Sequence, residues 1–194
     1  LSFFEDASGI THRTNITYTA PFFVFPATVT NPAGHVQLAS FDVTKGLVTE
    51  SRDENLNFSR YAYDPFLRLN SVTGPEKSTG WLDPAHPTLS VIYTFGLDTG
   101  VPSTILTQKR ENLVAGQFGT LDSKAYFDPV GRSLGTILEG PTAKFIHSGG
   151  AKYNVRGKVE RKYLPFFVGS LNDFALNESR PFIRTEFDEL DRPL

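Results

Sequence analysis

A turn motif that recurs along the chain constrains the fold more than any other feature of the sequence. In its fullest copy, within residues 60–72, Tyr61 and Tyr63 are followed directly by Asp64 and Pro65. Residues two apart project from the same face of an extended chain, so both rings belong to one strand face. The Asp64 carboxylate can accept hydrogen bonds from downstream backbone N–H groups, and Pro65 favours a type I turn. The stretch predicts a strand, a tight turn and a returning strand.

One pattern occurs five times in the sequence: an aromatic residue, then Asp or Asn, then a short turn and a strand. In two copies Gly131 or Gly157 lies three residues after the Asp or Asn, where a residue with positive φ completes a turn. Asp191 has that place in the last copy and tolerates the same backbone. Leu67 has it in the second copy and does not adopt this backbone comfortably, so a differently built turn is expected there. The first copy is one residue longer. The five pairs are Phe41-Asp42, Tyr63-Asp64, Phe127-Asp128, Tyr153-Asn154 and Phe187-Asp188.

A second, fainter turn signal alternates with these motifs near the N-terminus, in residues 6–9, 31–34 and 53–56. Asn31 and Asp53 are 22 residues apart (53 − 31), and Asp42 and Asp64 are also 22 apart (64 − 42). Two independent turn signals with one period predict a repeating unit of turn, strand, turn and strand. Each strand would have about six residues, an ordinary length.

The composition favours an all-β chain with antiparallel strands and hairpins. Aromatic residues make up 13% of the chain, and 16 Gly and 13 Pro supply frequent turns. Apolar residues at helical spacing occur in Gly169–Leu176 and in no longer window, so helix should be minor. The net charge of −2 gives no reason to expect nucleic acid or an anionic membrane as partner. There is no cysteine, which excludes disulfides and thiolate metal sites, and the longest apolar run, residues 22–25, is far too short to span a membrane.

The repeats are interrupted between Val72 and Tyr126. Residues 73–87 are rich in Gly and Pro and predict a surface loop, so the loop-rich insertion covers about 73–90. Strands are expected at 88–95 and 102–110. Because the chain begins and ends within a repeat, we expect residues 1–194 to form one segment of a longer array.

With these turns laid out, the chain resembles the RHS/YD-repeat proteins. It is most similar to the bacterial branch that includes the B component of Tc insecticidal toxin complexes and Salmonella virulence-plasmid B-type proteins. The family repeat has the form Gly-x-x-x-x-aromatic-x-Tyr-Asp-x-x-Gly-Arg-Leu. The stretches that resemble it are residues 34–75, 126–132 and 147–167.

The resemblance implies a fold and a role. The fold would be a spiralling YD-repeat β-shell made of long antiparallel strands, and the role would be to enclose a toxin or other C-terminal cargo. The resemblance also implies a secreted or surface-exposed bacterial protein whose partners are neighbouring repeats and the enclosed polypeptide. The family's self-cleaving aspartate site is not found: Asp128-Pro129-Val130-Gly131 is followed by Arg132, where the family's cleavage motif has Leu.

The sequence carries few patterns typical of catalytic or metal-binding sites. Residues 131–135 fit the Gly-x-Ser-x-Gly pattern of hydrolases, with Ser133 as nucleophile, but they overlap a repeat turn and run into an expected strand rather than a helix. Asp53-Glu54 and Asp188-Glu189 are interpreted as solvated turn residues rather than calcium ligands or acid–base pairs. The histidines, which fall at no metal-ligand spacing, are expected in loops or on strand surfaces: His12, His35, His86 and His147.

The repeated Asp residues have two interpretations, a periodic ligand site or turn formation. Asn154 in one copy favours turn formation, since Asn makes the turn bonds but weakens any site based on charge. The aromatic residues before them are expected to stack between strands, with a sugar-binding platform as the alternative. The sequence therefore predicts a non-enzymatic shell segment with no catalytic, cofactor or metal residue. The alternatives are a receptor- or glycan-binding surface module centred on Trp81, and a hydrolase using Ser133.

Overall fold

The computed structural model describes residues 2–5, 11–75, 83–96, 100–114 and 116–194. In these residues the chain is all-β: sixteen strands and a single turn of 3₁₀-helix, Pro141–Ala143, with no α-helix. Contacts within the chain divide it into two units, residues 1–90 with 110–119, and residues 91–109 with 120–194. Each unit is described in turn below.

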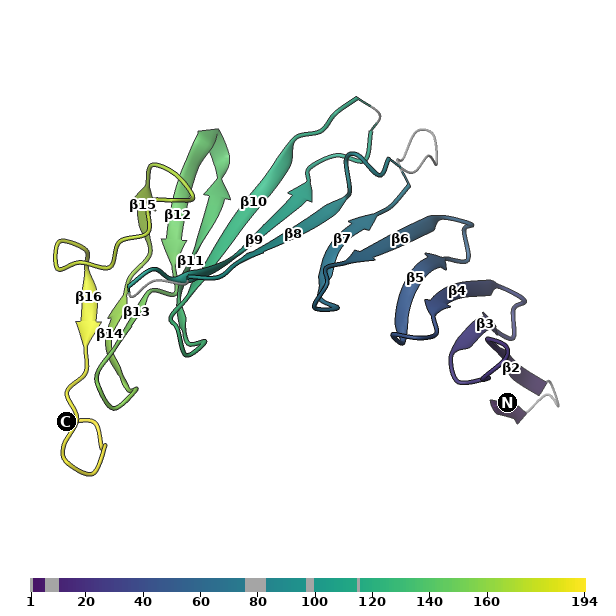
Figure 1. The fold of residues 1–194 in the computed structure, drawn as a ribbon, viewed down its shortest axis with the longest axis horizontal. Coiled ribbons are helices and arrows are strands. Elements are labelled where there is room, and N and C mark those ends of the chain that lie inside the picture. Colours follow the sequence, from purple (N-terminus) through teal and green to yellow (C-terminus); the bar gives the residue numbers. More distant parts are fainter. Residues whose placement is uncertain (1, 6–10, 76–82, 97–99, 115) are drawn as a thin grey trace. The chain divides into compact units, whose positions relative to one another are not determined.

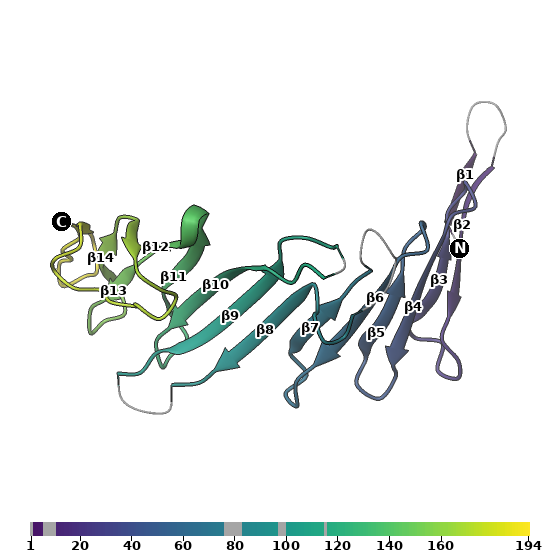
Figure 2. The ribbon, with the colours of Figure 1, turned by 90° about the horizontal axis from the view of Figure 1, so that it is seen from above.

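The first unit is an antiparallel sheet in which every strand pairs with the one before it in sequence (Figures 1 and 2). Its last pairing joins Ser71 and Val72 to Ser90 and Leu89, the first residues of β8 (Leu89–Thr94). The other strands are β1 (Ser2–Glu5), β2 (Thr11–Tyr18), β3 (Pro26–Thr30), β4 (Val36–Asp42), β5 (Leu47–Arg52), β6 (Phe58–Tyr63) and β7 (Leu69–Thr73).

The second unit continues the same plan and adds a small second sheet. Its larger sheet has the order β8, β9, β10, β11, β12, β15, and the smaller one has the order β13, β14, β16. The strands after β8 are β9 (Ser103–Arg110), β10 (Thr120–Phe127), β11 (Ser133–Gly140), β12 (Lys144–Ser148), β13 (Ala151–Tyr153), β14 (Val159–Tyr163), β15 (Phe166–Val168) and β16 (Phe182–Arg184).

Residue alternation explains why these segments pair as strands. In β6, Ser59, Tyr61 and Tyr63 are partly buried while Phe58, Arg60 and Ala62 are exposed, the period of two expected for an extended chain with unequal faces. The register of β6 against β7 shifts by one residue between Ala62 and Tyr63. Equivalent shifts occur before the turns that follow β4, β10 and β13. Such bulges are what a turn completed by a residue with positive φ produces.

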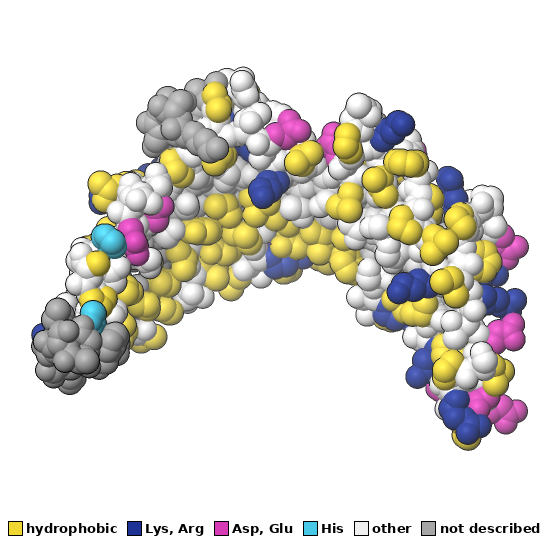
Figure 3. All heavy atoms as spheres, turned by 180° about the vertical axis from the view of Figure 1, so that it is seen from behind, with side chains coloured by type: hydrophobic (Ala, Val, Ile, Leu, Met, Phe, Trp, Pro, Cys, Tyr) yellow, Lys and Arg dark blue, Asp and Glu magenta, His cyan; other side chains and the backbone are white. Residues whose placement is uncertain are grey.

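Burial differs between the two units. The buried apolar residues among those described all belong to the second unit: Val91, Tyr126, Ile137, Ala151, Tyr163 and Phe166. The strands of the first unit instead keep apolar side chains open to solvent, among them Ile16, Val36 and Phe58. Hydrophobic side chains are accordingly visible at the surface of the molecule (Figure 3). The first unit is therefore held mainly by its hydrogen-bonded ladder and cross-strand pairs.

The all-β, antiparallel fold expected from the sequence is confirmed. The strands expected at 88–95 and 102–110 correspond to β8 and β9. Gly169–Leu176 forms no helix, in agreement with the expectation that helix is minor. Residues 76–82 of the predicted surface loop lie outside the described residues. No helix in the described part of the chain is long and apolar enough to cross a membrane.

Candidate functional site

The repeated Asp and Asn residues lie at reversals of the chain, in loops that we call aspartate corners. Four of them join paired strands, and the fifth, at Asp188, is closed by the isolated bridge between Phe187 and Pro193. In the corner between β6 and β7, the backbone N–H of Asp64 donates to Arg68 O (2.9 Å) and that of Leu67 donates to Asp64 O (2.9 Å). Oδ1 of Asp64 accepts from the backbone N–H groups of Phe66 (2.9 Å) and Arg68 (3.0 Å), and Oδ2 accepts from Arg68 Nε (2.7 Å). One carboxylate thus satisfies three donors of a four-residue loop.

The same bonds form at the later corners. At Asp128 the Oδ1 atom accepts from the N–H groups of Val130 and Arg132 (3.0 and 2.8 Å), and Oδ2 accepts from Arg132 Nε (2.6 Å). Asp188 makes the equivalent bonds with Leu190 and Arg192. At the Asn154 corner the amide oxygen accepts the two backbone bonds, from Arg156 and Lys158. An amide therefore suffices for the backbone bonds, and a carboxylate adds the arginine.

The fourth residue of each of these corners has positive φ: 63° at Leu67, 84° at Gly131, 78° at Gly157 and 62° at Asp191. The expectation that Leu67 would require a differently built turn is wrong, because Leu67 adopts the same backbone as the glycines. Its side chain is 47% exposed, so it meets little steric opposition from neighbours and the cost is confined to its own backbone.

The first corner is one residue longer, as the sequence indicates. Oδ1 of Asp42 accepts from Thr44 N (3.0 Å) and Thr44 Oγ1 (2.6 Å), and Gly46, with φ of 71°, donates its N–H to Asp42 O (2.8 Å). Lys45 Nζ lies 3.0 Å from Oδ2. The Thr44 hydroxyl, with Lys45, lowers the pKa of Asp42 from 3.8 to about 2.

The pKa values of the other corner aspartates are also lowered. Partial desolvation by itself raises the pKa of Asp128, but the hydrogen bonds from Arg132 and Val130 outweigh it and the net shift is downward. Asp64 follows the same balance with Arg68 and Phe66. At Asp188 the backbone bond from Arg192 is the largest cause of the lowered pKa. These carboxylates are therefore held ionised, as acceptors, and are unsuited to take up protons in general acid–base catalysis near neutral pH.

Sequence reasoning missed that the fainter turns of the first unit are corners of the same construction. Asn31 accepts from His35 N through its Oδ1 atom, and Gly34, with φ of 84°, donates to Asn31 O. Asp53 accepts from the N–H groups of Asn55 and Asn57, and Leu56 has φ of 67°. Gly34, three residues after Asn31, is a sequence signal that could have found the first of these corners. Leu56, three residues after Asp53, gives no such signal. The turn expected at 6–9 lies outside the described residues.

At three of the corners the preceding aromatic residue contacts the neighbouring hairpin. Tyr63 donates its hydroxyl proton to Val48 O (2.9 Å), and Tyr153 donates to Ser133 O (2.8 Å). Val48 and Ser133 each follow the preceding corner, on the returning strand, so the two contacts are equivalent. Phe41 instead stacks on Phe25, with ring centroids 4.9 Å apart. Phe127 and Phe187 are half-buried, and Phe187 pairs with Pro193 beyond its corner.

Two arginines also join successive corners of the second unit. The guanidinium of Arg132 lies 4.4 Å from the ring centroid of Tyr153, in the following corner. Arg156 donates to Asp188 O (3.0 Å) and forms an ion pair with Asp191 (2.9 Å). The aromatic positions were expected to stack ring on ring. Phe41 does so, whereas the links at Tyr63 and Tyr153 are hydroxyl bonds, and arginines supply the others. Within each unit, successive corners are therefore bonded to one another.

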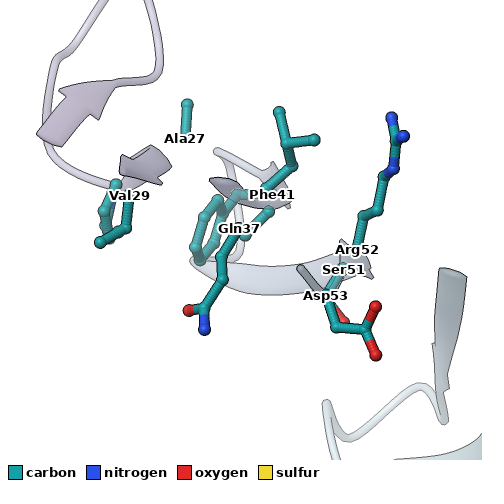
Figure 4. Close-up of a pocket in the computed structure, with 10 residues that line it drawn as sticks. Ala27, Val29, Gln37, Phe41, Ser51, Arg52 and Asp53 are labelled. Atoms are coloured by element: carbon teal, nitrogen blue, oxygen red, sulfur yellow. The ribbon is translucent and has the colours of Figure 1, made fainter. Parts of the chain in front are cut away.

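A shallow apolar depression of about 310 Å³ lies on the first unit beside its first corners (Figure 4). It is lined by Ala27 and Val29 of β3, Gln37 and Phe41 of β4, and Ser51 of β5, among others. Its polar lining consists of Gln37, Ser51, Arg52 and Asp53, and the Asp53 carboxylate already accepts hydrogen bonds from Asn55 and Asn57.

The other candidate residues are placed as follows. Ser133 is exposed and begins strand β11. A nucleophile elbow requires a helix after the serine, and here a strand follows instead. Asp53 is occupied by Asn55 and Asn57, and Glu54 accepts from Gln37 Nε2. Trp81 lies outside the described residues. Among the residues that the structure describes, no group of three His, Asp, Glu or Cys could hold a metal ion.

The histidines do not share one environment. His35 is exposed, and His86 donates or accepts at Asp83 (2.7 Å) while stacking on Phe118. His12 lies in β2. His147, in β12, is fully buried, so the expectation of a loop or strand-surface histidine is wrong for it.

Comparison with known proteins places the fold. No protein-family model and no curated protein matches the chain. Among solved structures, the chain superposes over its full length on the crystal structure of TcdB2-TccC3, with a TM-score of 0.65 and 15% sequence identity. The fold matches that of a Tc toxin. The structure of the Photorhabdus luminescens Tc holotoxin pore matches 93% of the chain, with a TM-score of 0.68 and 13% identity. The chain spans 13% of the length of each of these two proteins.

At these identities the likeness shows the fold alone. The structural neighbours belong to the group that the YD-type motifs had suggested, although the identity is low. The aspartate corners give the physical reason why a divergent sequence keeps this fold. Each needs only Asp or Asn at its first position and a tolerated positive φ at its fourth, so most other corner positions are free to change.

Proposed function

We propose that the chain is a wall segment of a bacterial RHS/YD-repeat shell, secreted or displayed at the cell surface, which encloses a toxin or other polypeptide cargo. In this role the segment is non-enzymatic, and its partners are neighbouring repeats of the same polypeptide and the enclosed cargo. The observation that carries the proposal is the series of corners bonded to one another within a fold that matches Tc toxin structures over the whole chain.

The proposed mechanism is physical. Antiparallel strands pair edge to edge, which leaves no unpaired backbone groups between them. The corners fix where each strand ends, and the tyrosine and arginine links hold each hairpin to the next. A wall of this kind excludes a protease from whatever lies behind it. The apolar side chains left open on the strands could then contact an enclosed, incompletely folded polypeptide.

The test is protease protection in the intact protein. We expect the cargo polypeptide to survive a protease concentration that degrades the same polypeptide when it is produced alone. Asp128→Ala should shorten that survival at least several-fold, because two backbone N–H groups and Arg132 lose their acceptor. Val130→Ala is the matched control, since Val130 lies in the same corner with a 74% exposed side chain. A cargo degraded equally fast inside and outside the wild-type protein would contradict the proposal.

A surface receptor- or glycan-binding module is the second candidate function. The observation that favours it is the tip between β2 and β3, where Phe22, Phe23 and Val24 are each more than 60% exposed. Exposed aromatic faces are a common feature of carbohydrate and protein recognition. Binding to a glycan array or to host cells that is lost in Phe22→Ala or Trp81→Ala, but retained in Phe66→Ala, would favour this function over the shell.

A further inference from the structure

His147 is a buried ionisable group that takes no part in the aspartate corners. It is fully buried, and neither ring nitrogen has a hydrogen-bond partner. A neutral imidazole without partners already loses hydrogen bonds to water, and a charged one would lose far more. A phenylalanine or leucine would fill such a site without that cost, so the histidine calls for an explanation.

The imidazole ring of His147 is enclosed by two aromatic side chains and two glycines. Phe166 of β15 stacks on it with centroids 4.7 Å apart, and Phe174 lies at 5.6 Å. A Cβ on Gly135 would stand 2.7 Å from the ring atoms Cε1 and Nε2, and one on Gly150 would stand 2.8 Å from Cε1. The two glycines thus leave room for the imidazole and for nothing larger beside it. We call His147, Phe166 and Phe174 the histidine latch.

The elements closed over His147 are weakly held elsewhere. Strand β15 has three residues and pairs with β12 alone, through Phe145↔Val168, Ile146↔Phe167 and His147↔Phe166. Residues 169–181 after it contain no helix or strand. Their attachments to β10 include Tyr126, which stacks on Phe174 and donates its hydroxyl proton to Leu171 O, and Lys124, which donates to Asn172 (2.7 Å). Short segments with few contacts open at low free-energy cost.

Charged groups near the latch do not favour a positive imidazole. Burial lowers the pKa of His147 below 6.5, and the Arg180 guanidinium, which lies 4.5 Å from the Phe166 ring centroid, lowers it further. No carboxylate contributes to this shift. The remaining ionisable groups on the elements packed around the ring are Asp122, Lys124 and Tyr126 on β10, Glu139 on β11, Lys144 on β12, Lys152 and Tyr153 on β13, Glu160, Arg161, Lys162 and Tyr163 on β14, and Asp173 and Glu178 in the 169–181 segment.

We propose that the histidine latch is acid-sensitive: taking up one proton on His147 releases β15 and residues 169–181 from β12. The proton binds the imidazole only after the latch opens, because the fully buried ring has no hydrogen-bond acceptor among the described residues. The direction follows from the pKa values, since a group whose pKa is lower in the closed state stabilises that state above the pKa of the open state. This stabilisation is lost as the pH falls below about 6.5.

The test is hydrogen exchange of the intact protein at pH 7.5, 6.5 and 5.5, corrected for the intrinsic pH dependence of exchange. With one proton taken up and an open-state pKa of about 6.5, the opening equilibrium of Phe166–Val168 should rise by about tenfold between pH 7.5 and 5.5, with roughly fivefold of that rise between pH 6.5 and 5.5. Amides of β4 and β5 should show no such rise. In His147→Phe the rise should vanish, whereas in the matched control His35→Phe, at an exposed histidine, it should persist.

Protection of Phe166–Val168 that is independent of pH from 7.5 to 5.5 would overturn the proposal, and so would an unchanged rise in His147→Phe. If that variant does not fold, the wild-type protein still decides. The Cε1–H resonance of His147 should titrate only as protection is lost. A ring that titrates near pH 6.5 while Phe166–Val168 stay protected would show that protonation does not open the latch.

Discussion

At the residue scale, the corner aspartates act as acceptors whose geometry the backbone dictates. A side-chain oxygen on the first corner residue reaches the N–H groups two and four residues later, which would otherwise face the inside of the loop unpaired. Asn and Asp do this equally, and Asp adds an ionic bond to the fifth residue where that residue is arginine. The Asn154 corner isolates the first contribution from the second.

The unfolding free energies of Asp128→Asn and wild type, compared at several pH values, should separate these contributions. We expect the amide to keep both backbone bonds and lose the arginine, at a cost of about 1 kcal/mol in unfolding free energy at pH 7. Because the folded-state pKa of Asp128 lies below 3.8, the carboxylate's contribution is complete above that pH and is lost as the pH falls through the folded value. Urea unfolding should therefore give a difference between variant and wild type that shrinks progressively as the pH falls below 3.8. A difference that does not change with pH would contradict this account.

Position 67 offers a test of the strained backbone. A non-glycine residue at positive φ costs roughly 1–2 kcal/mol of folding free energy. Glycine avoids this cost but loses more conformational entropy on folding, so its net advantage is smaller. Leu67→Gly should therefore be more stable than Leu67→Ala by about 1 kcal/mol, and Gly131→Ala should lose about the same amount, since nothing lies within 4 Å of its added Cβ. Urea unfolding measures both, and Leu67→Ala equal to or above Leu67→Gly would refute the prediction.

At the scale of elements, the links between hairpins explain why the corners recur. The Tyr63 hydroxyl reaches Val48 on the neighbouring strand, so it fixes one hairpin against the next and not merely its own turn. A turn that was only a turn would not require an aromatic residue before it. Ring stacking joins Phe41 to Phe25, whereas at Tyr63 and Tyr153 a hydroxyl or guanidinium contact links the hairpins.

Removal of that hydroxyl should loosen the neighbouring strand more than its own. We expect Tyr63→Phe to cost about 1 kcal/mol and to increase hydrogen exchange in β5 around Val48 several-fold. Tyr18→Phe, at a 46% exposed tyrosine, is the control and should change neither. An increase confined to β6 and β7 would indicate that the hydroxyl serves its own hairpin only.

Some features of the fold and of the corners could be predicted from the sequence, and others could not. The chain reversals after Asp42, Asp64, Asp128, Asn154 and Asp188 follow from side-chain-to-backbone hydrogen bonding, which is local and so visible in sequence. The backbone of Leu67 was misjudged because the surrounding ladder imposes a conformation that the residue itself disfavours. The burial of His147 depends on glycines and aromatic residues up to 27 residues away, a contact between distant segments that no local pattern reveals.

At the scale of the whole molecule, the two units differ in what stabilises them. The described apolar residues that are buried belong to the second unit, while the first relies on ladder hydrogen bonds and half-exposed pairs. In the 194-residue chain we expect amides of β4–β6 to lose protection at lower urea concentration than those of β10–β12, with opening free energies smaller by about 2 kcal/mol. Hydrogen exchange across a urea series measures this. Coincident loss of protection in both groups would contradict it.

The most direct test of the corners as bends of paired strands uses disulfide cross-linking, for which the absence of native cysteine gives a clean background. Ala62 pairs with Ser71 across the Asp64 corner, and Ala125 pairs with Thr136 across the Asp128 corner. Under mild oxidation, Ala62→Cys/Ser71→Cys and Ala125→Cys/Thr136→Cys should each form an internal disulfide, seen by mass spectrometry as the loss of two hydrogens. Ala62→Cys/Val72→Cys, shifted by one residue to the opposite face, should not. Cross-linking of the shifted pair in preference to the paired one would contradict the account.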